Sequence, residues 1–198
     1  MKTLERELTA FIERLDAERG HVLGILEGLS EQDLRRPVLP SGWSCLELVR
    51  HLTVDVERFW FRGVIAGEPE VADRLKAGAK AHWQVPDGLD ADAVFAEYRA
   101  EVERANRVLI GAGVGAGMDV GAGVDIGASV AGDAAGERVL EREPAYWPVE
   151  IWPYWRLPDL RSVLLHVLTE VSCHAGHLDA ARELIDGKVW LGRDPYAS

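Results

Sequence analysis

The sequence is poor in cysteine and in basic residues, and each scarcity excludes a class of protein. Its two cysteines, Cys45 and Cys173, stand on separate predicted helices, so the chain lacks the disulfide framework of a small secreted domain. Lysine and arginine total 22 against 33 acidic residues, for a formal net charge of −11. No run of lysines and arginines offers a local positive patch, and we therefore expect no nucleic-acid partner.

Long apolar runs are absent as well. No stretch reaches the roughly 18 uncharged apolar residues that a membrane-spanning helix needs, so we expect no membrane partner. The opening sequence MKTLERELTA is charged throughout, which is unlike a secretory signal. With reduced thiols as the default, these features predict a cytoplasmic protein.

The chain is rich in amphipathic helical patterns, and no segment shows the period-two alternation of a strand. We predict one all-α domain over residues 1–198, a four-helix bundle with long crossover loops. Its four helices are expected near residues 2–28, 44–66, 90–110 and 158–186.

Residues that start and stop helices stand at the ends of these stretches. Ser44 and Glu47 have the spacing of a capping box, and Asp90 is a candidate N-cap for the third helix. Gly187 follows the fourth helix as a C′ residue, the position that favours a left-handed backbone.

A Gly/Ala-rich segment, residues 111–136, separates the third and fourth helices. Glycine at this density opposes both helix and strand. The segment lacks the spacing of a dinucleotide fingerprint and the lysine of a P-loop. We predict an irregular insertion outside the bundle.

Three residues of the fourth stretch, Glu170, His174 and His177, share one helical face. Glu170 and His174 are one turn apart, so a carboxylate and an imidazole could bind the same metal ion. His174 lies on the apolar seam, where an imidazole needs a hydrogen-bond partner or a ligand. The alternatives are a hydrogen-bonded core histidine, a solvated Glu170 and an ordinary flanking His177.

A second histidine with similar placement is His51, which borders the apolar stripe of the second stretch. If the second and fourth helices are neighbours, His51 completes a Glu-His-His set. Three protein ligands leave an open coordination position, as catalytic metal sites do.

An aromatic cluster interrupted by prolines precedes the fourth helix. It could be a packed cover over the end of the bundle, or an aromatic wall that binds an apolar substrate. Trp43, just before the second helix, could play either role. The members of the cluster are Tyr146, Trp147, Trp152, Tyr154 and Trp155.

Two long motifs carry a family resemblance, SGWSCLELVRHL at 41–52 and EVSCHAGHLDAARELIDG at 170–187, supported by WFRGVIAG at 60–67. Through them the chain resembles the DinB-like (YfiT-like) superfamily of metalloenzymes. Within this superfamily it resembles an actinobacterial branch related to the N-terminal domain of mycothiol-dependent maleylpyruvate isomerase. Members are four-helix bundles that hold a divalent metal between the second and last helices.

Carried over by resemblance, the metal ligands are His51, Glu170 and His174. The Glu-x-x-x-His spacing matches the isomerase type, whereas many members have His-x-x-x-His. Zinc is the first expectation, with nickel, iron or manganese as alternatives.

His177 stands where many relatives have glutamine, and we assign it a catalytic role beside the metal. Glu47 and Asp55 are one turn either side of His51 and are candidates to orient its ring.

The resemblance implies a metal-dependent thiol S-transferase in detoxification, with mycothiol or another low-molecular-weight thiol as cosubstrate and an electrophile as second substrate. We assign Trp43 to the binding of that thiol. The alternatives are a metal-dependent hydrolase and a non-enzymatic metal-binding stress-response protein. Only residues 188–198 follow the last helix, so we do not expect the isomerase's C-terminal domain or its activity. A homodimer is left open.

Overall fold

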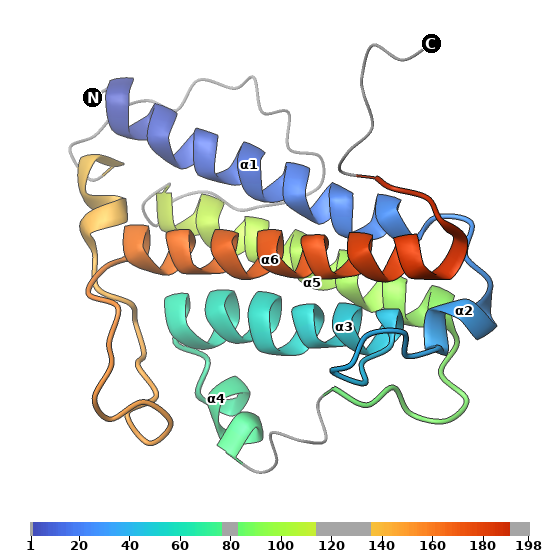
Figure 1. The fold of residues 1–198 in the computed structure, drawn as a ribbon. Coiled ribbons are helices and arrows are strands. Elements are labelled where there is room, and N and C mark those ends of the chain that lie inside the picture. The colour runs from blue at the N-terminus through green and yellow to red at the C-terminus, as the bar shows by residue number, and fades with distance from the viewer. Residues whose placement is uncertain (1, 77–82, 114–135, 191–198) are drawn as a thin grey trace.

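Four long helices lie side by side (Figure 1). The computed structural model describes residues 2–76, 83–113 and 136–190. The long helices are α1 (Lys2–Leu26), α3 (Cys45–His51) with its direct continuation η1 (Leu52–Ile65), α5 (Ala91–Gly113) and α6 (Leu160–Asp186). Three short helices are α2 (Glu31–Arg35), α4 (Pro69–Lys76) and the 3₁₀ helix η2 (Gly136–Glu141).

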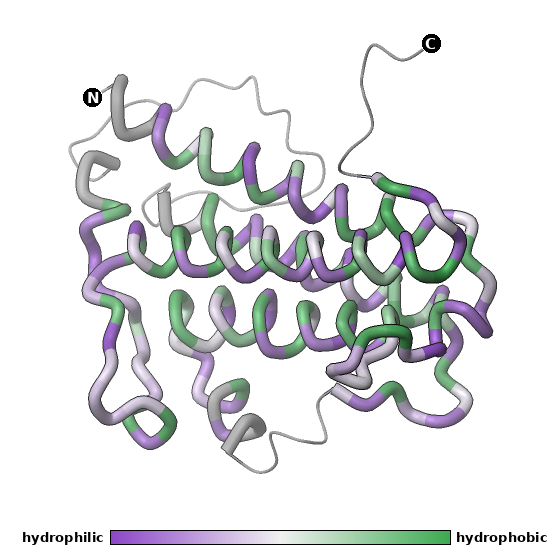
Figure 2. Tube along the Cα trace, viewed as in Figure 1, coloured by the Kyte–Doolittle hydropathy of each residue, from purple (hydrophilic) through white to green (hydrophobic). Residues whose placement is uncertain are grey.

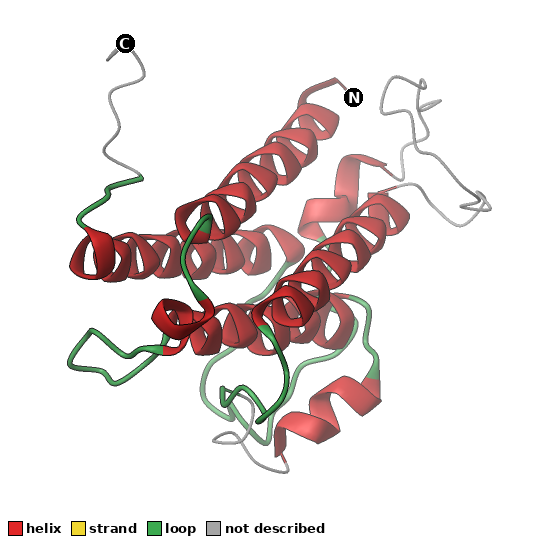
Figure 3. Ribbon diagram, turned by 90° about the vertical axis from the view of Figure 1, so that its right-hand side faces the viewer, coloured by secondary structure: helices red, strands yellow, loops and turns green. Residues whose placement is uncertain are grey.

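The described residues contain no strand (Figure 3), and the all-α prediction is confirmed. Among the same residues, no helix is long and apolar enough to cross a membrane. The four predicted helices match the long helices closely. Of the predicted insertion, residues 111–113 end α5 and residue 136 begins η2. The remainder lies outside the described residues.

The first and last helices run in parallel. Near their starts, Arg161 binds Glu7 at 2.8 Å, and near their ends the Arg182 guanidinium donates to the Ile25 carbonyl oxygen. The pair α3–η1 and α5 are also parallel to each other and run opposite to α1 and α6 (Figure 1). The connection between η1 and α5, which carries α4, must therefore return along the length of the bundle.

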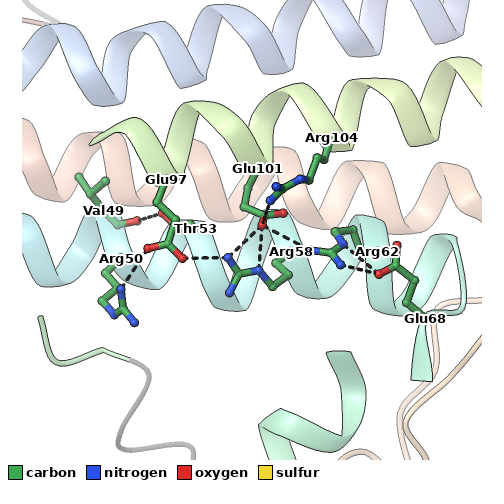
Figure 4. Close-up of polar contacts among 9 residues, drawn as sticks. All are labelled: Val49, Arg50, Thr53, Arg58, Arg62, Glu68, Glu97, Glu101 and Arg104. Atoms are coloured by element: carbon green, nitrogen blue, oxygen red, sulfur yellow. Dashed lines mark hydrogen bonds and ion pairs between the residues drawn. The ribbon is translucent and has the colours of Figure 1, made fainter. Parts of the chain in front are cut away.

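Ion pairs join η1 to α5 (Figure 4). The buried Glu101 carboxylate accepts hydrogen bonds from Arg58, Arg62 and Arg104, at 3.0, 3.4 and 2.7 Å. Arg58 also donates to Glu97 at 2.9 Å. Residue numbers rise together along both helices through this network, so it fixes their parallel alignment.

The predicted helix ends are confirmed. Both bonds of the capping box are present: the Ser44 hydroxyl accepts from the Glu47 N–H, and the Glu47 carboxylate accepts from the Ser44 N–H. Asp90 accepts from the Ala93 N–H at 2.8 Å at the start of α5. Gly187 has φ of 75°, the left-handed conformation expected of a C′ glycine.

The second long helix differs from the regular α-helix that the periodicity predicts. After His51 it widens into a π-helix, η1, closed at its end by a bond from the Ala66 N–H to the Phe61 carbonyl oxygen. At the transition, the Val49 carbonyl accepts from the Thr53 hydroxyl at 2.8 Å and also from the Leu52 N–H. A side-chain hydroxyl that bonds four residues back competes with the α-helical ladder, which favours the change of register.

No residue of η1 is fully exposed, so its charged residues are at least partly buried with it. Figure 2 shows hydrophilic and hydrophobic residues mixed along this helix. Glu57 is completely buried and binds the buried Arg19 of α1 through two bonds, at 2.8 and 2.7 Å. Arg19 also donates to Asp16 and to Asn106 of α5. Burial alone would lower the pKa of Arg19, but the adjacent Glu57 carboxylate raises it, so the guanidinium stays charged.

The segment after α6 folds back against α1. The Trp190 N–H donates to the Asp179 carboxylate at 2.6 Å, and the indole ring lies against Gly24. A Cβ at Gly24 would stand 2.5 Å from the Trp190 ring, whereas a Cβ at Gly20 would meet nothing within 4 Å. Glycine at position 24 is therefore a packing requirement.

We predict that Glu57→Gln lowers the free energy of unfolding by roughly 3–5 kcal/mol, because the buried guanidinium of Arg19 loses its buried counter-charge and keeps only the exposed carboxylate of Asp16. Urea denaturation measures this change. Glu143→Gln is the matched control: it removes a carboxylate from the exposed Arg156 pair and should leave the urea midpoint unchanged. Equal effects of the two substitutions would show that the buried pair is not needed for stability.

The two glycines of α1 provide a second test. Gly20→Ala should stabilise the protein by about 0.5–1 kcal/mol, because alanine restricts the unfolded chain and favours helix. Gly24→Ala should not show this increase in stability, because the Trp190 ring must move away from α1. The same movement should shift the Trp190 indole N–H resonance. An unchanged Trp190 resonance in Gly24→Ala would contradict the observed packing.

Candidate functional site

His51 ends α3 at the junction with η1 and is 9 % exposed. Its Nδ1 lies 2.9 Å from the Asp55 carboxylate, one turn further along. The interaction engages Nδ1 as a donor and leaves Nε2 to bind a ligand. Of the two candidate orienting residues, Asp55 makes this contact, whereas Glu47 is used in the capping box of α3.

Helix α6 contributes a carboxylate and two imidazoles from successive turns. His174 is 8 % exposed, and its Nε2 lies 3.5 Å from the Glu170 carboxylate. Its Nδ1 lies 3.4 Å from Nδ1 of His177, so one of these nitrogens carries the proton and donates. His177 itself is exposed.

The antiparallel packing of α3–η1 on α6 brings the two helices' histidines together. The rings of His51 and His174 are 4.9 Å apart, and one ligand atom from each of His51, Glu170 and His174 lies within 4.8 Å of the others. Two imidazole nitrogens and a carboxylate oxygen are a donor set that suits zinc and similar divalent ions. The sequence-derived triad therefore forms one cluster that could hold a metal.

Electrostatics keep His174 neutral. Burial, and then the neighbouring His51 and His177, lower its pKa to about 4. A metal ion binds the neutral form of imidazole, so at neutral pH this residue needs to lose no proton to become a ligand.

Two tryptophans cover the histidines. The Trp43 ring centroid is 6.3 Å from His51 and 6.0 Å from His174, which places this predicted binding residue beside the cluster. Trp83, from the connection before α5, lies 4.1 Å from both Trp43 and His51. Sequence reasoning missed Trp83, because an isolated tryptophan in an irregular loop carries no signal of where that loop packs.

The proline-interrupted aromatics pack elsewhere on α6. Trp60 of η1 stacks on Trp152 with centroids 5.4 Å apart and contacts His166 at 4.6 Å. His166 precedes Glu170 by one turn. Trp147 is buried in this group, whereas Trp155 is partly exposed at its edge. These rings therefore lie around His166, and Trp43 is the predicted aromatic that contacts the histidine pair.

Comparison with known proteins identifies one family. The model of the family described as mycothiol-S-transferase matches residues 10–123 and 131–187. This match includes all of α3, η1 and α6, which carry the cluster. Neither a curated protein nor a solved structure matches the chain significantly.

We predict that the purified protein binds one divalent ion and that His174→Ala abolishes this binding, because only two of the three ligands would remain. Metal analysis after dialysis measures the bound metal, and calorimetric titration with zinc measures the affinity of each protein for the ion. His177→Gln, three residues further on, is the control and should retain the metal. Full zinc binding by His174→Ala would exclude this cluster as the metal site.

Proposed function

The chain belongs to the mycothiol-S-transferase family, and from this premise we propose that it is a metal-dependent S-transferase that joins the sulfur of a small thiol to an electrophilic carbon. Mycothiol is the thiol that the family description indicates. Detoxification of reactive electrophiles is the role that such a reaction serves. The observation that carries the proposal is the convergence of His51, Glu170 and His174.

The donor set supports the metal part of the proposal. These three residues would hold a divalent ion, which would supply the positive charge that lowers the pKa of a nearby thiol toward neutrality. Asp55 fixes the ring orientation of His51 through Nδ1. Since the pKa of His174 is already low, that ligand does not compete with a proton near neutral pH.

We assign the thiol proton to His177. Its ring lies beside His174, with the two Nδ1 atoms 3.4 Å apart, and the unprotonated nitrogen of the His177 imidazole accepts the proton from the S–H group. The exposed imidazole can then release that proton to solvent. The resulting thiolate sulfur forms a bond to the electrophilic carbon, and the leaving group departs with the electron pair of the bond that breaks.

Trp43 and Trp83 support the same chemistry by covering the histidines with aromatic faces. Their rings exclude water from one side of the cluster, which strengthens electrostatic interactions there. We assign Trp43 to the thiol, because its ring lies about equally far from His51 and His174.

We predict that mycothiol added to the cobalt-substituted protein produces a sulfur-to-cobalt charge-transfer band, and that the His174→Ala protein shows neither this band nor turnover. His177→Gln should keep the band and lower the transfer rate modestly, because it retains the metal ligands but loses the proton acceptor. Absorption spectra and transfer to a fluorogenic electrophile measure the two effects.

The same experiment separates the competing functions. Turnover by a metal-free His174→Ala protein would overturn metal catalysis. Cleavage of esters without any thiol band would favour a hydrolase. A metal-loaded protein that neither binds thiols nor cleaves esters would favour a non-enzymatic metal-binding protein.

A further inference from the structure

A small cavity of about 110 Å³ opens beside the histidines, between the start of α3 and the second half of α6. We call it the side pocket. Its walls include Trp43, Cys45, Leu48, His177, Leu178 and Ala181.

Two wall residues of the side pocket, Trp43 and His177, lie beside the candidate metal cluster. Trp43 lies 6.0 Å from the His174 ring, and His177 has its Nδ1 3.4 Å from Nδ1 of His174. A molecule seated in the pocket therefore reaches the edge of the cluster without crossing a helix.

The walls of the side pocket are apolar and fixed. Cys45, Leu48, Leu178 and Ala181 are each at most 5 % exposed, so they are core side chains that cannot swing away. Burial raises the pKa of the Cys45 thiol to about 11, so this group is neutral and acts as a small apolar surface. The Ser44 hydroxyl at the rim is already paired with Glu47.

The size of the cavity limits its occupant. Apolar cavities of about 150 Å³ stay dry and accept benzene, so about 110 Å³ encloses roughly four or five carbon atoms, and a six-carbon group fits with one edge in the open mouth of the pocket. A thiol built on a sugar does not fit this chemistry, because its hydroxyl groups would be buried without partners. A branched alkyl group or a phenyl ring fits it.

We propose that the side pocket binds the apolar substituent of the electrophile and so selects the second substrate. This inference rests on the proposed S-transferase function. The preferred class is then a small electrophile, such as a terminal epoxide, whose reactive carbon lies a few bonds from an alkyl or phenyl group of up to about six carbons. The thiolate sulfur bonds to the terminal CH₂ group, the C–O bond breaks, and the oxygen takes a proton from water.

A series of epoxides with methyl, phenyl and naphthyl substituents tests the proposal. In the wild type, kcat/KM should be about 10–100-fold higher for phenyl than for methyl, as burial of an apolar group allows. Ala181→Leu fills the pocket and should bring the phenyl-to-methyl ratio close to one. Ala180→Leu, an exposed neighbour on the same helix, should leave the ratio unchanged.

Ala181→Gly is a second variant, which enlarges the pocket and should shift the preference toward naphthyl. A phenyl-to-methyl ratio near one in the wild type, or an unchanged preference in both Ala181 variants, would overturn the proposal.

Toluene binding to metal-free protein, followed through the Trp43 indole resonance, provides a readout independent of catalysis. Toluene binding without any thiol transfer would contradict the S-transferase function but not the pocket. Thiol transfer without toluene binding and without a substituent preference would contradict the pocket but not the S-transferase function.

Discussion

The buried ion pair between Arg19 and Glu57 is the constraint on which the arrangement of the bundle depends. Glu57 is fully buried, and a carboxylate in that position is tolerable only where a guanidinium meets it. Arg19 reaches Glu57 with two bonds and Asn106 with a third, so α1, η1 and α5 meet at one point. A shift of η1 by one residue would carry Glu57 away from Arg19 into apolar surroundings.

The same constraint positions the candidate site. His51 precedes Glu57 by six residues on the continuous helix α3–η1. Fixing Glu57 therefore fixes where His51 lies along the helix axis and the direction in which it points around that axis. Glu101 of α5 adds a second restraint, because it binds Arg58 and Arg62 of η1 and so holds the two helices together (Figure 4). With two faces of the continuous helix α3–η1 tied to α1 and α5, its remaining face presents His51 to His174 of α6. The ion pairs thus act on the site through geometry and make no contact with the histidines.

Local signals in the sequence were sufficient for the helices and for the members of the cluster. A capping box or a C′ glycine such as Gly187 works within a few residues, and the i, i+4 spacing of Glu170 and His174 follows from helical geometry alone. Features that depend on distant residues were not predictable in this way. Glu57 finds Arg19 across 38 positions, and Trp83 meets His51 through an irregular connection. The π-helix has no periodic signature of its own, because its residues are buried on nearly every side.

The segment from Trp43 to Asp55 shows why a short motif can indicate a whole site. Ser44 caps the helix, which fixes the direction in which α3 begins. That direction sets Trp43 over the histidines at one end of the segment, and the widening of the helix after His51 occurs directly beside the cluster at the other. π-Helical turns often accompany functional sites, and here the turn begins where Asp55 engages His51. One stretch of 13 residues therefore supplies a cover, a candidate ligand and its orienting carboxylate, while α6 supplies the other two candidate ligands.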